Sequence, residues 1–160
     1  MRHGKAIKEV ASGVDYDRGL EERGKTDVAD VIQTLSKTKY IPELIVASPA
    51  KRTLKTAEIA LLELKLKKDK LLFESSIYEA QIKDLMHVIR ELDDHYKTVL
   101  LIGHNPSITS LVGMLTPSFI EHTPTSGLSV ISLKVDTWQL VQQQKGKLEL
   151  TISPKHKSII

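Results

Sequence analysis

Residues 98–106 read TVLLIGHNP, an apolar run that leads straight into a turn. Thr98–Ile102 is the most strand-like run in the chain, since aliphatic and β-branched side chains favour a buried strand. Asn105 can cap a helix, and Pro106 suits the first turn of one. The stretch therefore predicts a strand over residues 98–102 and a helix after it, with His104 in the connection between them.

Residues 44–64 follow the same design. Leu44–Ala47 is a short apolar run that predicts a buried strand, and Ser48 with Pro49 indicates the start of a helix. That helix is expected from about residue 50 to about residue 64, which places Arg52 in its first turn.

Strands alternate with helices along the rest of the chain. Apolar periodicity predicts further helices over residues 21–36, 82–93 and from 106 onward, and further strands over residues 71–73, 128–135 and 148–153, with a short helical turn at Trp138. This alternation favours an α/β fold built as a three-layer sandwich, in which helices cover both faces of a mostly parallel central sheet. No repeat or change in composition marks a boundary, so residues 1–160 are expected to form a single domain.

The composition is that of an ordinary globular protein, because 41% of the 160 residues are hydrophobic and 27% are charged. The net charge of +3 permits anionic substrates, and nothing in it points to nucleic acid. The chain has no cysteine, which excludes disulfides, thiolate zinc sites and a cysteine nucleophile. No apolar run approaches the roughly 18 residues of a membrane-spanning helix. We therefore expect no membrane association and a cytoplasmic location.

Four side chains that bind anions or attack electrophiles stand near the ends of expected strands. Arg52 and His104 follow two of the strands, and Arg2 and His3 are adjacent in the stretch RHG. Ligands of open parallel sheets bind at the carboxyl edge of the sheet, where helix N-termini add free N–H groups. A guanidinium suits phosphate oxygens, and a neutral imidazole can act as a nucleophile. The sequence therefore predicts an anion pocket, and it contains neither a glycine-rich phosphate loop nor a carboxylate cluster for a metal.

Members of the histidine phosphatase superfamily, which includes phosphoglycerate mutases and acid phosphatases, carry motifs similar to three stretches of this chain. These stretches are RHG (2–4), SPAKRTLKTA (48–57) and GHNP (103–106). Two further stretches, DRGLEERG (17–24) and PTSG (124–127), add a likeness to the small SixA-type phosphohistidine phosphatases. The likeness covers nearly the whole chain, and it implies the phosphoglycerate mutase-like form of the α/β sandwich.

The resemblance implies a role for each residue of the predicted pocket. His3 is the expected nucleophile, which carries a transient phosphoryl group. The expected ligands of the phosphoryl oxygens are Arg2, Arg52 and His104, and Arg18 matches an additional pocket arginine of the SixA type. Phosphoryl transfer depends mainly on positioning and on donors aimed at these oxygens. Because water later removes the phosphoryl group from His3, neither a cofactor nor a metal is expected.

Larger members of the superfamily use a carboxylic acid to protonate the leaving oxygen. Glu79 follows the strand expected at residues 71–73, about where such an acid would lie, although it can equally be an exposed loop carboxylate. SixA-type members lack this acid. An imidazole leaves a phosphoramidate readily once it is protonated, so a weak or absent acid favours phosphohistidine over alkyl phosphates.

The expected function is hydrolysis of phosphohistidine on proteins through a covalent intermediate on His3. Two alternatives remain: a phosphatase of small phosphate esters with the same nucleophile, and a non-catalytic module that binds phosphate, against which the complete pocket argues. The expected partner is a phosphorylated protein or a small phosphorylated substrate, and a phosphate or sulfate ion is expected to fit the site. Ser48 and Asn105 are expected to cap helices rather than to touch the substrate.

The superfamily places a central strand directly before the arginine of its first motif, and here only Met1 precedes Arg2. We therefore expect several apolar residues upstream of Met1 in the natural protein. If the chain begins at Met1, another segment must fill the central position of the sheet, because His3 needs a rigid support to fix its direction.

Overall fold

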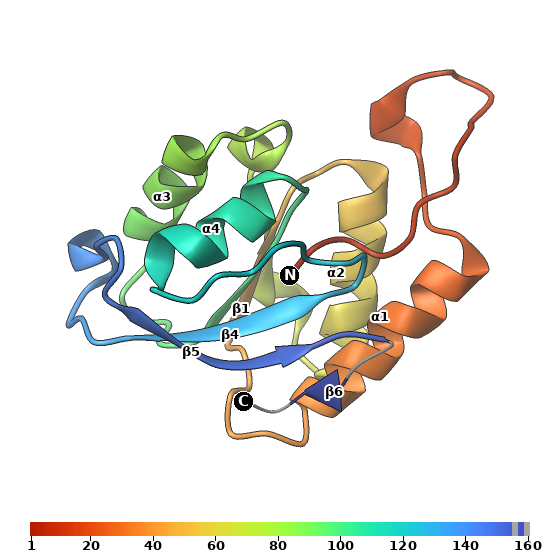
Figure 1. The fold of residues 1–160 in the computed structure, drawn as a ribbon. Coiled ribbons are helices and arrows are strands. Elements are labelled where there is room, and N and C mark those ends of the chain that lie inside the picture. Colours follow the sequence, from red (N-terminus) through yellow and green to blue (C-terminus); the bar gives the residue numbers. More distant parts are fainter. Residues whose placement is uncertain (155–156, 159–160) are drawn as a thin grey trace.

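Residues 1–3 cross the middle of the structure, a computed structural model that describes residues 1–154 and 157–158 (Figure 1). The helices are α1 (Glu22–Leu35), α2 (Lys51–Glu63), α3 (Ile82–Arg90) and α4 (Ser107–Leu115). The strands are β1 (Leu44–Ala47), β2 (Leu71–Phe73), β3 (Val99–Ile102), β4 (Leu128–Leu133), β5 (Gly146–Ile152) and β6 (Lys157–Ser158). Within these described residues, no helix is long and apolar enough to cross a membrane.

Two three-stranded sheets lie on either side of residues 1–3. In the first sheet, β1 is central and pairs in parallel with β2 and β3. In the second, β5 is central and pairs antiparallel with β4 and β6. Backbone hydrogen bonds tie residues 1–3 to both sides: Met1 N to Leu101 O at 2.8 Å, His3 N to Gly103 O at 3.1 Å, and Arg2 N to Gly127 O at 2.9 Å. His3 is therefore held at the junction of the two sheets.

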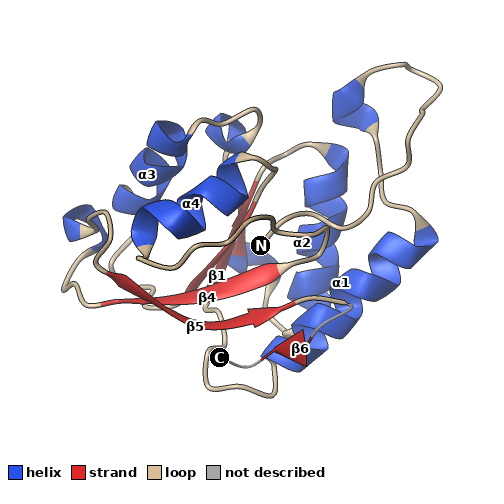
Figure 2. Ribbon diagram, in the orientation of Figure 1, coloured by secondary structure: helices blue, strands red, loops and turns tan. Residues whose placement is uncertain are grey.

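Helices cover both faces of the sheets, as the strands in Figure 2 lie between α1 and α2 on one side and α3 and α4 on the other. One core includes Val28 of α1 and Ile45 of β1, and the other includes Leu85 of α3 and Val46 of β1. Successive residues of β1 thus point to opposite cores, which explains why the whole strand is apolar. The three-layer α/β arrangement expected from the sequence is confirmed.

The second sheet differs from the sequence expectation in its direction and its bounds. β4 and β5 are antiparallel, whereas a mostly parallel sheet was expected. Their connection contains only the 3₁₀ turn Trp138–Leu140, and parallel neighbours need a longer crossover, usually with a helix. β4 ends at Leu133 and β5 begins at Gly146, so both strands differ by a few residues from their expected ranges. The molecule is therefore a sandwich with a mixed set of strands.

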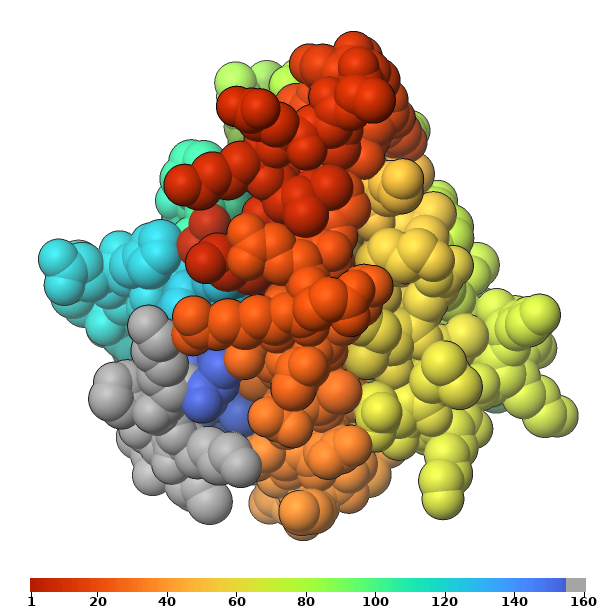
Figure 3. Space-filling view, turned by 90° about the vertical axis from the view of Figure 1, so that its right-hand side faces the viewer, coloured from red at the N-terminus to blue at the C-terminus, as the bar shows by residue number. Residues whose placement is uncertain are grey.

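Helix α1 contains Gly24 at a point where the backbone after His3 passes very close to it. A Cβ built on Gly24 would meet Lys5 O, as well as Lys5 N at 2.8 Å, and a Cβ built on Gly4 would lie 2.9 Å from Gly24 O. Both glycines therefore allow the helix to approach the segment that carries His3. Figure 3 shows α1, in orange, with the loop that precedes it, in red, on the same face of the molecule.

Gly24→Ala should destabilise the protein, although alanine normally favours a helix. The new methyl group would meet backbone atoms of Lys5, which cannot rotate away, so we expect the free energy of unfolding to fall by about 1–3 kcal/mol. Urea unfolding followed by circular dichroism measures this change. Gly113→Ala in α4 is the matched control, because a Cβ there meets nothing within 4 Å and should be neutral or stabilising. Equal stability of the two variants would contradict the close-approach argument.

Candidate active site

The imidazole of His3 is buried, and one hydrogen bond sets its orientation. Only 8% of the residue is exposed, and Nδ1 lies 2.7 Å from Gly4 O. A carbonyl oxygen can only accept, so Nδ1 carries the proton and Nε2 keeps its lone pair. The amide of Gly4 donates in turn to Thr56 Oγ1 at 3.0 Å, which fixes this turn to α2. His3 is therefore held with a nucleophilic nitrogen.

Both histidines of the site are neutral at neutral pH. Burial lowers the pKa of His3 to about 3, and the neighbouring charges of Arg52 and Arg2 act in the same direction. Burial also lowers the pKa of His104 to about 4. The positive charges of Arg52 and Arg2 lower it further, and the negative charge of Asp15 raises it in part. The two rings lie side by side, with centroids 5.3 Å apart. A buried site rich in guanidinium groups thus disfavours imidazolium and preserves the lone pair of His3.

His104 is oriented by Ser48, whose Oγ lies 2.8 Å from Nε2. When the hydroxyl donates to Nε2, the ring proton is on Nδ1, a buried atom that has no hydrogen-bond partner in the described part of the chain. Nδ1 can then donate to the oxygen of a ligand. The ring of Tyr78 packs edge-on against His104, with centroids 5.6 Å apart.

The expectation that Ser48 and Asn105 act as helix caps is wrong in detail. α2 begins at Lys51 with Ala50 as its N-cap, although Ser48 Oγ still accepts from the amide of Ala50 at 3.4 Å. The N-cap of α4 is Pro106, and the Asn105 side chain donates to Thr123 O at 2.9 Å instead. In both cases a distant partner at the site competes with the local helix end for the polar side chain.

Arg52 is almost fully buried, and its partner is Asp15 from the loop before α1. Nη1 donates to Asp15 O and Nη2 donates to Asp15 Oδ2, both at 2.9 Å. The same carboxylate accepts from Arg18 Nη1 at 2.9 Å and from the Tyr78 hydroxyl at 3.1 Å. Partial burial opposes ionisation of Asp15, but the hydrogen bonds from Arg18 and Arg52 outweigh it and lower its pKa to about 2. The site therefore holds an internal anion between two arginines.

Arg2 approaches the site from the other side. Its Nη1 donates to Thr123 O at 3.0 Å and lies 3.2 Å from Nε2 of the exposed His122. Its Nε is buried and has no hydrogen-bond partner in the described residues. Arg2 thus has a fixed guanidinium with one donor still free to meet an anion.

Glu79 is not drawn into this network. The residue is exposed, its backbone has a φ of 54°, and it forms no hydrogen bond or ion pair within the described range. Its role as an acid stays a prediction. The described residues also contain no group of three or more His, Asp or Glu side chains that could hold a metal ion.

Asp15 and Tyr78 reach the site although the sequence assigned them no role. The spacing of Asp15 and Arg18 is the i,i+3 spacing of an ion pair in a helical turn, and it could have indicated that contact. No local signal connects Asp15 with Arg52 or with Tyr78, because these contacts join residues far apart in the chain.

Solved structures with a similar fold cover nearly the whole chain. SixA from Agrobacterium tumefaciens superposes with a TM-score of 0.78 at 24% identity, over 96% of this chain and 95% of that one. The protein histidine phosphatase SixA complexed with tungstate superposes with a TM-score of 0.82 at 23% identity, over 97% of this chain and 95% of that one. An uncharacterised chloroplastic protein of Arabidopsis thaliana is 25% identical over 166 residues, which span 96% of this chain and 76% of that protein.

The family itself is shown by a sequence model. The model of the histidine phosphatase superfamily (branch 1) matches residues 1–83, which is more than half of the chain. The matched part contains His3, Arg52 and the loop that carries Asp15 and Arg18. On this match, the chain belongs to the histidine phosphatase superfamily.

Proposed function

We propose that the protein is a phosphatase that hydrolyses phosphohistidine on proteins, with His3 as the nucleophile that carries the phosphoryl group. Membership of the superfamily supports phosphatase activity. The observation that carries the proposal is the neutral, buried imidazole of His3, whose Nδ1 is held by Gly4 O while guanidinium groups lie close by. The similarity to a SixA structure complexed with tungstate supports an oxyanion as the ligand.

The reaction has two displacements at phosphorus. Nε2 of His3 first attacks the phosphorus atom, the bond from phosphorus to the substrate imidazole breaks, and that imidazole takes a proton from solvent. Water then attacks the phosphorus atom, the bond to His3 breaks, and inorganic phosphate leaves while a proton returns to solvent. The sum is hydrolysis of the substrate, and no other reactant is consumed.

The surrounding donors suit the charge of the transferred group. Arg2 has a free, buried Nε–H, and His104 offers Nδ1 when Ser48 donates to its other ring nitrogen. Arg52 donates one N–H to the backbone carbonyl of Asp15 and another to its carboxylate, so one of its donors already meets an anionic oxygen. Fixed donors of this kind stabilise the transition state because they need no reorganisation during the reaction.

The choice of phosphohistidine over phosphate esters depends on the leaving group. The carboxyl group of Asp15 acts electrostatically on His104, and its pKa of about 2 leaves it ionised and unable to donate a proton at neutral pH. Glu79 is exposed and outside the hydrogen-bonded network. An alkoxide leaves poorly without an acid, whereas an imidazole is protonated by water at neutral pH. The arrangement therefore favours a phosphoramidate substrate.

His3→Ala should abolish turnover of a phosphohistidine-bearing protein, because the nucleophilic nitrogen is lost. The wild-type protein should hydrolyse this substrate and should carry an acid-labile phosphoryl group after rapid quenching, measured with ³²P-labelled substrate. His87→Ala, an exposed histidine of α3, is the matched control and should keep full activity.

Comparison with para-nitrophenyl phosphate separates the alternatives. Faster turnover of the ester than of phosphohistidine would favour a phosphatase of small phosphate esters. Phosphate binding without hydrolysis of either substrate would favour the binding module. Label on the His3→Ala variant equal to that on wild type would overturn the assignment of the nucleophile.

Glu79→Gln should change turnover of phosphohistidine less than about twofold, because imidazole leaves without help from a protein acid. Steady-state kinetics at pH 7 measures kcat for the variant and for wild type. A fall of tenfold or more would show that Glu79 moves toward the leaving group during the reaction, and it would contradict the argument made from the leaving group.

Asp15→Asn should bind inorganic phosphate about tenfold more tightly than wild type. The carboxylate competes with phosphate for Arg52. A hydrogen bond to a charged group contributes about 1.5–3 kcal/mol of binding free energy when it is buried, and less when the groups are partly exposed to solvent. Isothermal titration calorimetry at low salt measures the dissociation constant.

Asp17→Asn is the control for this measurement, since it removes the same charge from the same loop and forms no ion pair within the described residues. Its affinity for phosphate should change little. Weaker binding by Asp15→Asn would mean that Asp15 positions Arg52 for the ligand and does not compete with the ligand.

A further inference from the structure

Four aromatic rings form a continuous row that leads from His3 to the molecular surface. The ring centroids of His3 and His104 are 5.3 Å apart. The ring of Tyr78 lies 5.6 Å from that of His104 and 5.1 Å from that of Tyr16. These separations are those of interacting aromatic rings. Exposure rises along the row, from 8% for each histidine to 37% for Tyr16. The row therefore connects the buried nucleophile with solvent.

Tyr16 stands at the outer end of this row and stabilises neither core. It belongs to the short 3₁₀ turn Asp15–Asp17, and it is absent from both clusters of core residues. Within the described residues its hydroxyl forms no hydrogen bond, and its ring contacts the ring of Tyr78. Tyrosine is common in binding sites, because its body is apolar and its tip is polar. The ring of Tyr16 is thus available to a ligand.

Tyr78 and the turn that carries Tyr16 are both fixed by the site. The Tyr78 hydroxyl donates to Asp15 Oδ2 at 3.1 Å, and Arg52 donates to two oxygens of Asp15. The planes of the two tyrosine rings are nearly perpendicular, at 84°. Perpendicular neighbours form a corner in which a third planar ring can stack on one and meet the other edge-on. The corner is therefore built before any ligand arrives.

The leaving group of the proposed reaction lies on the solvent side of the phosphoryl group. Nε2 of His3 attacks from within the protein, and an in-line displacement puts the leaving atom opposite to it. A histidine on another protein can reach this site only from solvent. The row runs from His3 past His104, a proposed ligand of the phosphoryl oxygens, and ends at the two tyrosines. The tyrosines therefore lie where the imidazole of the substrate must be placed.

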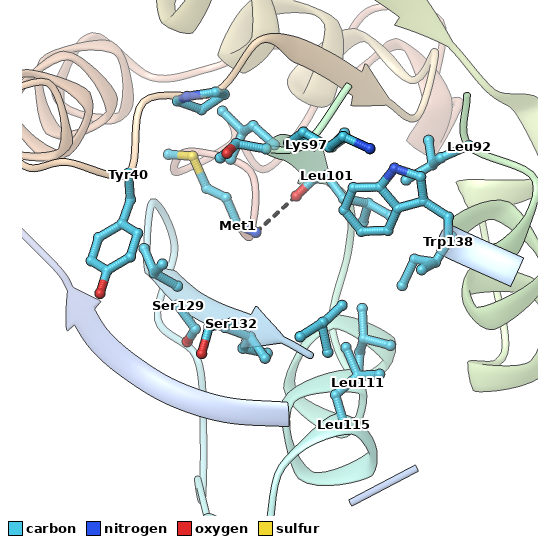
Figure 4. Close-up of a pocket in the computed structure, with 18 of the residues that line it drawn as sticks. Met1, Tyr40, Leu92, Lys97, Leu101, Leu111, Leu115, Ser129, Ser132 and Trp138 are labelled. Atoms are coloured by element: carbon cyan, nitrogen blue, oxygen red, sulfur yellow. Dashed lines mark hydrogen bonds between the residues drawn. The ribbon is translucent and has the colours of Figure 1, made fainter. Parts of the chain in front are cut away.

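The apolar cleft next to Met1 is a different space. Its volume is about 380 Å³, and Figure 4 shows it bordered by Met1 and Leu101, with Trp138 near one end. None of the four rings of the row lines this cleft, and neither does any of the predicted phosphate ligands. A substrate ring that is bonded to the phosphoryl group therefore cannot occupy it.

We propose that Tyr16 and Tyr78 form the binding site for the imidazole of the substrate, and that they select planar aromatic leaving groups over groups without a ring. The inference rests on the proposed function and specifies how its substrate is recognised. The imidazole stacks on one tyrosine and meets the other edge-on. Because this contact exists before and during the transfer, it contributes to substrate binding more than to the chemical step.

Binding of two phosphonates tests the proposal without any turnover. Phenylphosphonate and cyclohexylphosphonate have the same charge and similar size, but only the first has a planar ring. Wild type should bind phenylphosphonate about fivefold more tightly, the effect of roughly one aromatic pair. Tyr16→Leu should remove this preference, and Tyr16→Phe should retain it because the ring remains. Isothermal titration calorimetry measures the four-way comparison of ligands and variants.

Phe119→Leu is the matched control for these measurements. Phe119 is also an exposed aromatic residue in a loop, with 91% of its surface accessible, and it lies outside the row of rings. Its replacement should leave the affinities for both phosphonates unchanged. A preference for phenylphosphonate that is absent from wild type, or that survives in Tyr16→Leu, would overturn the proposal.

Steady-state kinetics separates recognition of the ring from support of the loop. Phosphohistidine and phosphoramidate share the phosphorus–nitrogen bond, but phosphoramidate has no ring. Tyr16→Leu should lower kcat/KM for phosphohistidine about fivefold, mainly through KM, and should change kcat/KM for phosphoramidate less than about twofold. Equal losses for both substrates would mean that Tyr16 only positions Asp15 and its loop, and they would overturn the proposal.

Failure of the proposed function would have a different signature. Wild type would then turn over neither phosphohistidine nor phosphoramidate, while the preference for phenylphosphonate and its loss in Tyr16→Leu would remain. That result would support the ring-binding site and overturn the phosphohistidine phosphatase.

Discussion

The structure depends on holding an uncharged imidazole in a buried site beside guanidinium groups. Burial and positive neighbours both disfavour the protonated ring, so the pKa of His3 falls to about 3 and its lone pair persists. The ring direction comes from Gly4 O, and the Gly4 amide is fixed by Thr56 of α2. The backbone of residues 1–3 is bonded to both sheets. The unprotonated Nε2 of His3 therefore follows from where the backbone places the ring.

The second requirement is charge balance around Arg52. A nearly buried guanidinium without a partner would be strongly unfavourable, and Asp15 from an otherwise exposed loop supplies the anion. Arg18 lies in the same loop and shares the carboxylate. In the proposed reaction, a phosphoryl group that binds Arg52 would replace Asp15 and leave it with Arg18 and Tyr78 as partners. The proposal therefore couples binding of the anion to the position of this loop.

The features that could be predicted from the sequence are those with local signals. The apolar runs of β1 and β3 predict buried strands, and parallel topology then brings Arg52 and His104 to one edge. The rest depends on contacts that no local pattern encodes. Asp15 meets Arg52 across a loop, and the direction of β5 follows from a connection without a crossover helix. Gly24 looks like a helix breaker, yet it is the residue that lets α1 approach Lys5.

The geometry of the pocket depends on how the two sheets are held together. Arg52 and His104 follow β1 and β3 of the first sheet, whereas Arg2 is oriented by Thr123 on the approach to β4 of the second. His3 lies at the junction, which consists of a few backbone hydrogen bonds. A displacement of about 1 Å in a reacting group can cost about 10²-fold in rate. The few backbone bonds of residues 1–3 therefore set the distance between His3 and the arginines on either side.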